Sequence, residues 1–326
     1  MKLLSNFVST YSGMQTRYSL RLQKPAKKWT LMLPGAGCEY WKRTGGCTMC
    51  GFNNATQKYT HGYRYPSLVF DSFFKLADWH SNSNPEELVI FNGGNFWNND
   101  EMPIGFQEKI CKRVAEHPSL QILLIENRCE YITAEKIKTA KKMLGEKRLK
   151  VAIGFESQDD YVRNKLIRKG LSKKTFEEKV KLLKDNGADV FAYIFLKPLG
   201  LSEGRALEET IATIKYAISI GVDEMDISCA FIQAGTVMAE KYGKGEFTPP
   251  RLWTVLEIIN QIQKNNWPVN IGGFDDEPPP LAIPANCESC STAIYEAIEK
   301  FRRTRVLGKI PDCSCKKKWE KEISLP

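Results

Sequence analysis

Short apolar runs alternate with amphipathic stretches along most of this 326-residue chain. Each run has five to eight residues and is rich in aliphatic and aromatic side chains, a pattern typical of buried β-strands. The six predicted strands are Trp29–Leu33, Glu87–Phe91, Gln121–Ile125, Lys150–Phe155, Asp189–Leu196 and Glu224–Ser228. The stretches between them predict helices, and two of these helices end at Gly187 and Gly221, because glycine permits the left-handed backbone that closes a helix.

Because strands and helices alternate, the strands are expected to be parallel and joined by crossover helices. Six such units predict an α/β protein built as a partial (β/α)6 TIM-like barrel, with a doubly wound open sheet as the alternative. In both folds ligands bind at the carboxyl ends of the strands. The loops that follow the predicted strands are therefore the places to look for chemistry.

The pattern changes after Thr248. A Pro-Pro pair announces a helix over Pro249–Lys264, and Trp267–Ile271 predicts a seventh strand. Four prolines between residues 278 and 284 then interrupt any regular element. We predict a barrel domain over residues 1–275 and a small, basic, metal-binding C-terminal region over residues 276–326.

The charge of the chain is positive and unevenly distributed. Lys and Arg number 47 against 38 Asp and Glu, which gives a net charge of +9. The excess lies in three runs, Glu135–Lys150, Arg163–Lys184 and Glu299–Glu322. Such runs are commonly solvated helix faces, but three of them favour a polyanionic partner such as nucleic acid.

The chain has no apolar stretch of signal-peptide or membrane-span length, which predicts a soluble cytoplasmic protein without a membrane partner. Ten cysteines are many for a reducing compartment, where disulfides seldom persist. Clustered cysteines in such a protein are more often metal ligands or catalytic thiols.

Three cysteines, Cys38, Cys47 and Cys50, follow the first predicted strand with the spacing C-x8-C-x2-C. Five glycines between residues 35 and 51 allow the backbone to fold closely around a bulky inorganic group. A structural zinc site takes four ligands, whereas an iron–sulfur cluster held by three cysteines leaves one iron open. Three ligands therefore favour the cluster. The alternatives are three buried thiols without a function and a zinc site with a distant fourth ligand.

Four more cysteines lie near the C-terminus in two close pairs, Cys287 with Cys290 and Cys313 with Cys315. Two such pairs predict a closed tetrahedral metal site. Structural Zn²⁺ is the simplest occupant, and an auxiliary iron–sulfur cluster is the alternative. Basic residues surround these cysteines, so the region is a candidate contact for a phosphate backbone.

The three-cysteine loop, together with FNGGN at Phe91–Asn95 after the second predicted strand, resembles the radical S-adenosylmethionine superfamily. The resemblance implies a [4Fe-4S] cluster on the three cysteines, whose open iron binds S-adenosyl-L-methionine. Gly93, Gly94 and Asn95 would then contact the amino end of that cofactor, and its cleavage would give a 5′-deoxyadenosyl radical. The first cysteine gap is longer than the usual C-x3-C, and Asn95 replaces an acidic residue.

Two further motifs resemble the elongator-like branch of this superfamily. IENRCEYIT begins at Ile125, where Glu126 would accept hydrogen bonds from an amine of the substrate or cofactor. A surface ion pair between Glu126 and Arg128 is the alternative. IGFES begins at Ile153 and places Glu156 in an apolar context, where an acid needs a partner. The resemblance implies that Glu156 contacts the ribose or amine of the cofactor.

Later motifs, including LKP at residues 196–198 and AFIQAGT at residues 230–236, resemble the radical enzymes of archaeosine formation in tRNA. That likeness implies cleavage of a carbon–nitrogen bond in a lysine adduct on 7-deazaguanine. It also implies tRNA as the substrate, an electron donor such as ferredoxin or flavodoxin, and a lysine transferase related to tRNA-guanine transglycosylase as a partner.

Two other functions compete with this one. A radical enzyme of the same superfamily that acts on a small molecule or a peptide would leave the basic runs as solvated faces. A noncatalytic, zinc-bearing nucleic-acid-binding protein would need the tail cysteines and the basic runs but no iron.

Overall fold

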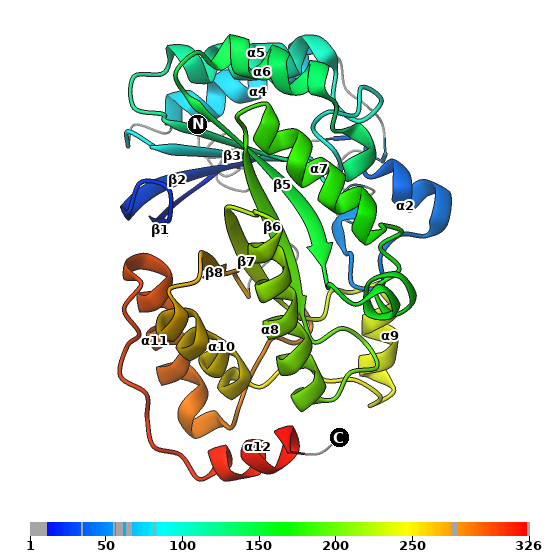
Figure 1. Ribbon diagram of the computed structural model, residues 1–326, viewed down its shortest axis with the longest axis vertical. Helices are drawn as coiled ribbons and strands as arrows, with labels where there is room; N and C mark the ends of the chain where they lie inside the picture. Colours follow the sequence, from blue (N-terminus) through cyan, green and yellow to red (C-terminus); the bar gives the residue numbers. More distant parts are fainter. Residues whose placement is uncertain are drawn as a thin grey trace. The chain divides into compact units, whose positions relative to one another are not determined.

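The computed structural model of the chain describes residues 12–33, 35–54, 56, 61–62, 67–80, 83–274 and 279–324. These residues form one sheet whose strands follow one another in chain order (Figure 1). The strands are β1 (Ser12–Ser19), β2 (Lys24–Met32), β3 (Glu87–Phe91), β4 (Ile122–Glu126), β5 (Arg148–Glu156), β6 (Asp189–Leu196), β7 (Glu224–Cys229) and β8 (Val269–Ile271).

The strands from β2 onward include every predicted strand, the seventh among them. Strand β2 pairs in parallel with β3, β3 with β4, β4 with β5, and β7 with β8. A doubly wound sheet would reverse its strand order at a switch point, and this sheet does not. The prediction of a partial (β/α)6 TIM-like barrel is therefore confirmed, with the cysteine-bearing extension at its C-terminal end.

Strand β1 was missed by the sequence prediction. It pairs antiparallel with β2, and its sequence SGMQTRYS is mostly polar. An edge strand of this kind is held by backbone hydrogen bonds to a single neighbouring strand, here β2, so it needs no run of apolar residues.

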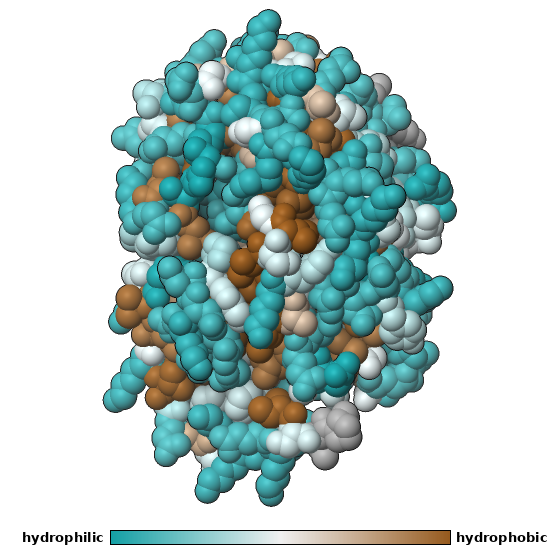
Figure 2. Space-filling model, viewed as in Figure 1, coloured by the Kyte–Doolittle hydropathy of each residue, from teal (hydrophilic) through white to brown (hydrophobic). Residues whose placement is uncertain are grey.

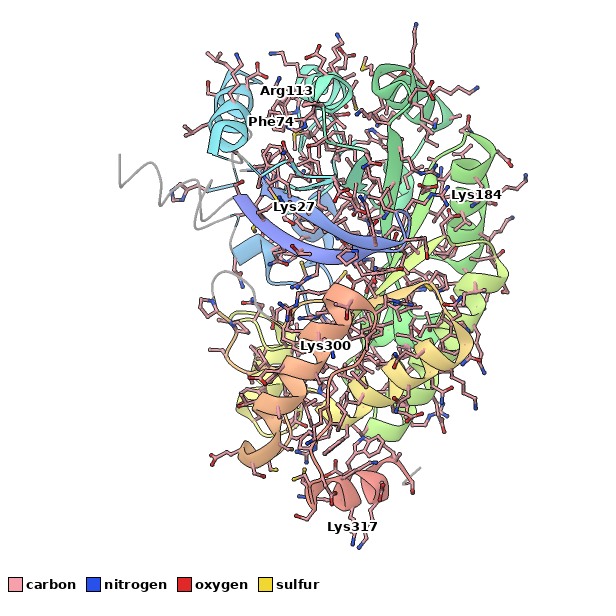
Figure 3. The ribbon with its side chains drawn as sticks, turned by 90° about the vertical axis from the view of Figure 1, so that its left-hand side faces the viewer. Lys27, Phe74, Arg113, Lys184, Lys300 and Lys317 are labelled. Atoms are coloured by element: carbon pink, nitrogen blue, oxygen red, sulfur yellow. The ribbon has the colours of Figure 1, made fainter. Side chains whose placement is uncertain are left out.

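The chain divides into two compact units. The first contains the described residues up to Gly45, together with Phe52–Ile153 and Glu177–Phe191. Its helices are α2 (Glu39–Thr44), α4 (Ser67–His80), α5 (Ile104–Glu116) and α6 (Ala134–Leu144), and a 3-10 turn, η1, spans Cys129–Tyr131. Helices α4, α5 and α6 lie side by side (Figure 1). The Phe74 ring of α4 packs 5.5 Å from the ring of Trp29 in β2, which anchors this layer on the sheet (Figure 3).

The second unit contains Gly46–Gly51, Gly154–Phe176 and the described residues from Ala192 onward. Its helices are α8 (Glu203–Ser219), α9 (Val237–Gly243), α10 (Leu252–Asn265), α11 (Glu288–Thr304) and α12 (Cys315–Ile323), with a π-helical turn, η2, at Val162–Leu166. Helix α7 (Lys173–Asp185) begins in this unit and ends in the first. As predicted, α7 and α8 are followed by glycines of positive φ, 69° at Gly187 and 91° at Gly221.

Parts of the three basic runs are internal. Lys150, Arg163 and Arg302 are buried, and the Arg163 guanidinium donates to the carbonyls of Leu171 and Ser157 at 2.6 and 2.7 Å. The remaining cations of the runs lie largely at the surface, and labelled examples such as Lys184 and Lys317 project away from the ribbon (Figure 3). Hydrophilic side chains cover most of the face shown in Figure 2.

No helix in the described part of the chain is long and apolar enough to span a membrane.

Candidate functional site

The loop that follows β3, Asn92–Asn95, is here called the glycine loop. It approaches two neighbouring segments so closely that side chains cannot be added. A Cβ on Gly94 would lie 2.1 Å from the Glu101 carboxylate, and a Cβ on Gly35 would lie 2.2 Å from the Asn92 carbonyl oxygen. Gly93 adopts a φ of +66°, a conformation that glycine adopts at no steric cost. Gly93 and Gly94 of the FNGGN motif are therefore positions where a larger side chain would clash or strain the backbone.

Glu101 holds this loop in place. Its buried carboxylate accepts hydrogen bonds from the backbone N–H and the side-chain amide of Asn95, the latter at 2.9 Å. It also accepts from the Asn98 amide at 2.9 Å and from the backbone N–H of Glu39 at 2.8 Å. Burial raises the pKa of Glu101, and these N–H donors oppose that rise. One carboxylate thus ties the glycine loop to the start of α2, directly after Cys38.

Asn95 connects the glycine loop to the segment after β4. Its side-chain amide donates to Glu101, and its carbonyl oxygen accepts from the backbone N–H of Arg128 at 2.7 Å. The backbone N–H of Phe96 donates to the carbonyl of Glu126 at 2.9 Å. Both ends of the Asn95 side chain are therefore engaged within the protein. Its position brings Glu126, predicted as a cofactor contact, next to the glycine loop in the same unit.

Asn92, the first residue of the glycine loop, carries an unsatisfied amide. Its side chain is 2% exposed, and neither its oxygen nor its nitrogen has a hydrogen-bond partner among the described residues. A buried amide without partners costs free energy on the order of 1–3 kcal/mol per lost bond, so such groups usually await a ligand or water. A polar ligand against the glycine loop would satisfy it.

Cys38 lies beside this network, at the N-cap of α2. Burial raises the pKa of its thiol, and Glu101 adds to the rise, whereas the backbone N–H of Trp41 and the Arg128 guanidinium oppose it. The Arg128 guanidinium also lies 3.8 Å from the centroid of the Tyr40 ring, within the long gap between the first two cysteines. A bound metal would reverse this balance, because a coordinating thiol loses its proton outright.

Cys47 and Cys50 belong to the second compact unit, and Cys38 to the first. The two residues form one turn, in which the Cys50 backbone N–H donates to the Cys47 carbonyl at 3.1 Å. Thr48 anchors this turn by donating from its hydroxyl to the Leu166 carbonyl at 2.9 Å, and Cys47 packs against a buried apolar cluster that includes Met238. The turn is thus built on a rigid core.

Glu156, also predicted as a cofactor contact, has a partner within the protein. It is buried at the end of β5 with a φ of +69°, and the Lys169 ammonium lies 2.8 Å from its carboxylate. The expectation that a buried acid here needs a partner is met by this ion pair.

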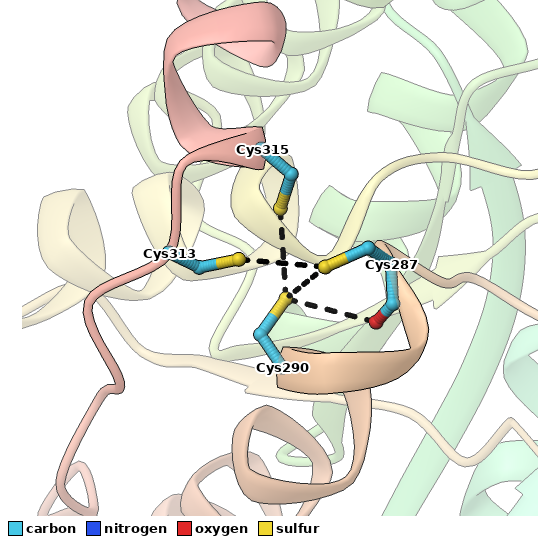
Figure 4. A group of neighbouring side chains, drawn as sticks. All are labelled: Cys287, Cys290, Cys313 and Cys315. Atoms are coloured by element: carbon cyan, nitrogen blue, oxygen red, sulfur yellow. Dashed lines mark hydrogen bonds between the residues drawn. The ribbon is translucent and has the colours of Figure 1, made fainter.

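The four tail cysteines come together in the second unit (Figure 4). Their sulfurs all lie within 4.8 Å of one another, with Cys287 3.5 Å from Cys290 and 3.4 Å from Cys313, and Cys290 3.6 Å from Cys315. Four sulfurs around one ion at about 2.3 Å would stand about 3.8 Å apart at the corners of a tetrahedron. In a cubane cluster each thiolate binds a different iron, which spreads the sulfurs further. The spacing fits a single tetrahedral ion.

Glu101 and Asn92 were not assigned a role by the sequence prediction. Asn92 lies inside the FNGGN motif, so its type and place were visible, but its lack of a partner was not. Glu101 stands six residues beyond Asn95 in a polar loop, WNNDEMP, where an acid is ordinary. Only the fold shows that this acid points back at the glycine loop.

No protein-family model matches the sequence. Two curated relatives are named archaeosine synthase subunit beta. The protein of Methanosarcina acetivorans is 30% identical over 303 residues, which covers 92% of this chain and 86% of the relative. The protein of Thermococcus kodakarensis is 27% identical, covering 91% and 92% respectively.

A solved structure of Elp3 from Methanocaldococcus infernus shares the fold, with a TM-score of 0.50 at 20% identity over 74% of this chain. The alignment spans 62% of that structure, less than two thirds of its length. The Methanosarcina relative is similar to this chain over nearly its whole length, and the sheet of this chain has the strand order of a partial barrel. The chain therefore belongs to the archaeosine synthase subunit beta family of radical S-adenosylmethionine enzymes.

Proposed function

We propose that this enzyme modifies a base in tRNA, by archaeosine-type cleavage of the carbon–nitrogen bond of a lysine adduct on 7-deazaguanine. The names of the relatives support the reaction, and the exposed cations of the basic runs support the polyanionic substrate. The observation that supports the radical chemistry is the glycine loop, with its close backbone approach and the buried Asn92 amide, which no described residue hydrogen-bonds.

In this proposal Cys38, Cys47 and Cys50 hold a [4Fe-4S] cluster, and S-adenosyl-L-methionine binds against Gly93 and Gly94. When bound, these groups would supply radical chemistry: an electron from an external reductant would cleave a carbon–sulfur bond of S-adenosyl-L-methionine, with methionine leaving, to provide a 5′-deoxyadenosyl radical for hydrogen-atom abstraction. The chain's own residues bind and orient them. Asn92 and Asn95, at the two ends of the glycine loop, are buried, and Gly93 and Gly94 are half-buried.

The side chains around the loop have distinct tasks in the proposal. Asn92 hydrogen-bonds the polar end of the cofactor, since its amide offers one donor group and one acceptor. Glu126 accepts from an amine of the cofactor or substrate, and Glu156 contacts the cofactor with its charge balanced by Lys169. Asn95 acts by holding the loop, because its side chain is already engaged by Glu101 and Arg128.

We further propose that residues 276–326 form the metal-binding region, with one Zn²⁺ on Cys287, Cys290, Cys313 and Cys315. The sulfur spacing supports one ion over an auxiliary cluster. The reaction also requires an electron donor such as ferredoxin or flavodoxin, and a transglycosylase-related lysine transferase that supplies the adduct. We place this system in the cytoplasm.

The experiment that tests the function follows the nucleosides of tRNA. Anaerobically reconstituted enzyme, S-adenosyl-L-methionine and a reductant are incubated with tRNA that carries the lysine adduct, and the digested nucleosides are analysed by mass spectrometry. We expect the adduct to disappear and a formamidine nucleoside to accumulate with 5′-deoxyadenosine. An unchanged nucleoside profile, or turnover of the free nucleoside in place of tRNA, would refute the proposed substrate.

Replacing Glu101 with glutamine should weaken the glycine loop. The hydrogen bonds that the Glu101 carboxylate accepts from described residues all come from N–H groups, so the amide of a glutamine would place a donor against donors. We expect the free energy of unfolding in urea to fall by about 1–3 kcal/mol and the KM for S-adenosyl-L-methionine to rise. Glu116→Gln, at an exposed position at the end of α5 in the same unit, is the matched control. Equal KM values for the two variants would contradict a positioning role for Glu101.

A further inference from the structure

A cavity of about 150 Å³ lies beside the four tail cysteines, entirely within the second unit. Its walls come from the start of α10, from α12 and from the segment before α11. Cys287 and Cys315 form the wall on the metal side. The volume of this cavity matches about one six-membered aromatic ring.

Two tryptophans, Trp253 of α10 and Trp319 of α12, line the cavity. Their indole N–H groups are already used, at 3.2 Å to the Cys315 sulfur and at 2.8 Å to the Thr254 hydroxyl. The parts of the rings that remain for a ligand are apolar faces and edges. Such surfaces favour a flat aromatic ligand, because stacking on tryptophan does not depend on the ligand's polar pattern.

Asn286 supplies an uncharged polar group to the cavity wall. Its side-chain oxygen and nitrogen are both inaccessible to solvent, and neither has a hydrogen-bond partner among the described residues. Its backbone is fixed by an N–H donated to the Ser291 hydroxyl at 3.0 Å. One donor and one acceptor on a planar amide match the paired donor and acceptor on the edge of a nucleobase.

Charge decides between a base and a phosphate inside the cavity. The guanidinium of Arg251 is paired with the Glu322 carboxylate at 3.0 and 3.1 Å, so the two charges cancel. Four thiolates around one divalent ion carry a net charge of about −2, which repels a phosphate. Phosphate is favoured instead at the exposed lysines that begin α12, Lys316, Lys317 and Lys318, the last of which lines the cavity.

We propose that this cavity binds one unpaired nucleobase of the tRNA substrate, with the adjoining phosphates on Lys316, Lys317 and Lys318. The proposal rests on the proposed function and deepens it, since it identifies a contact away from the glycine loop. The base bound here anchors the tRNA through stacking on tryptophan and through the Asn286 amide.

The test uses the full-length, metal-loaded protein and a set of tRNA transcripts, each with one abasic nucleotide at an unpaired position. Equilibrium binding is measured by fluorescence anisotropy for the wild type, for Asn286→Leu and for the control Asn260→Leu, an exposed asparagine of α10. We expect Asn286→Leu to bind intact tRNA roughly 5- to 150-fold more weakly, and Asn260→Leu to bind like the wild type.

The decisive result is a coupling. At one position the abasic nucleotide should weaken binding to the wild type but not to Asn286→Leu. Changing the three lysines to glutamine should make the salt dependence of binding less steep by about 2 in log–log slope, whereas Asn286→Leu should leave it unchanged. Metal content and a thermal melt check the fold of each variant, and Asn286→Asp, which keeps the size of the side chain, repeats the test.

Equal binding by wild type and both Asn286 variants, or abasic effects that are the same in all proteins, would overturn the cavity proposal. That outcome leaves the proposed function standing if the wild type converts tRNA. Failure of the wild type to convert tRNA would overturn the proposed function itself, and the two results are therefore separable.

Discussion

Alanine in place of Cys38, Cys47 or Cys50, one residue at a time, is expected to remove the cluster iron and all turnover from the reconstituted protein. Three thiolates bind three of the four irons of a [4Fe-4S] cluster and leave one open. Loss of any one thiolate would leave a second iron without a protein ligand. Iron content per chain and the charge-transfer absorbance of the brown protein are the measurements. S-adenosyl-L-methionine cleavage should fall to background in each variant.

The chain offers matched controls for this experiment. Cys111 and Cys229 are buried outside the motif, and burial raises the pKa of each thiol to about 12. Both are therefore protonated at neutral pH and are poor metal ligands. Cys111→Ala and Cys229→Ala should keep the full iron content and the absorbance.

A protein that kept its colour without Cys38 would contradict the assignment of the three ligands. Cys38 and the Cys47–Cys50 turn are held by different residues. Each part is held independently, Cys38 beside the Glu101 network and the turn by Thr48. Glu101→Gln and Thr48→Val therefore perturb one side of the motif at a time.

Strands β3, β4 and β6 could be predicted because each is almost wholly buried and leaves a continuous apolar run. ELVIF and DVFAYIFL became β3 and β6 with the predicted bounds. Strand β1 could not be predicted, since its polar sequence is stabilised by pairing with β2 and not by its own hydrophobicity. The pattern of apolar residues reflects burial, and an edge strand such as β1 is mostly half-buried or exposed.

The candidate site divides in the same way. Gly93 and Gly94 could be identified from a motif, because a close backbone approach demands glycine. The partners of Glu101 and Glu156 could not, since each depends on a loop whose course the sequence does not give. Glu156 meets Lys169, 13 residues away on a turn of the chain, and no periodic pattern connects the two. The same limit applies to Arg163, which the charge pattern assigns to a surface and the fold buries.

Removal of the tail metal is expected to release α12. The helix begins at a proposed ligand, Cys315. It is otherwise held by packing against α8, where the Ile323 carbonyl lies against Gly204, by the Trp319 indole, which donates to Thr254, and by the Glu322–Arg251 pair. A helix of nine residues has little stability of its own. Structural zinc contributes on the order of 10 kcal/mol to the folding of small metal-bound domains.

Cys290→Ala is the variant of choice, because Cys290 is 1% exposed and lies in the first turn of α11. The other pair, Cys313 and Cys315, lies just before and at the start of α12. We expect one equivalent of zinc to be lost and the backbone amides of residues 315–323 to exchange with solvent at close to the unfolded rate. Hydrogen exchange with mass spectrometry measures this. The brown colour and the amides of β2 to β4 should be unchanged, because the proposed cluster would be held by Cys38, Cys47 and Cys50 instead.

Ser314→Ala, at an exposed position between Cys313 and Cys315, is the control and should keep both the zinc and the slow exchange. Loss of iron in place of zinc from Cys290→Ala would show an auxiliary cluster and contradict the single-ion interpretation of the sulfur spacing. Retention of slow exchange in α12 after complete zinc loss would mean that the Trp319 and Glu322 contacts suffice. In that case the metal would serve the adjoining cavity and not the attachment of the helix.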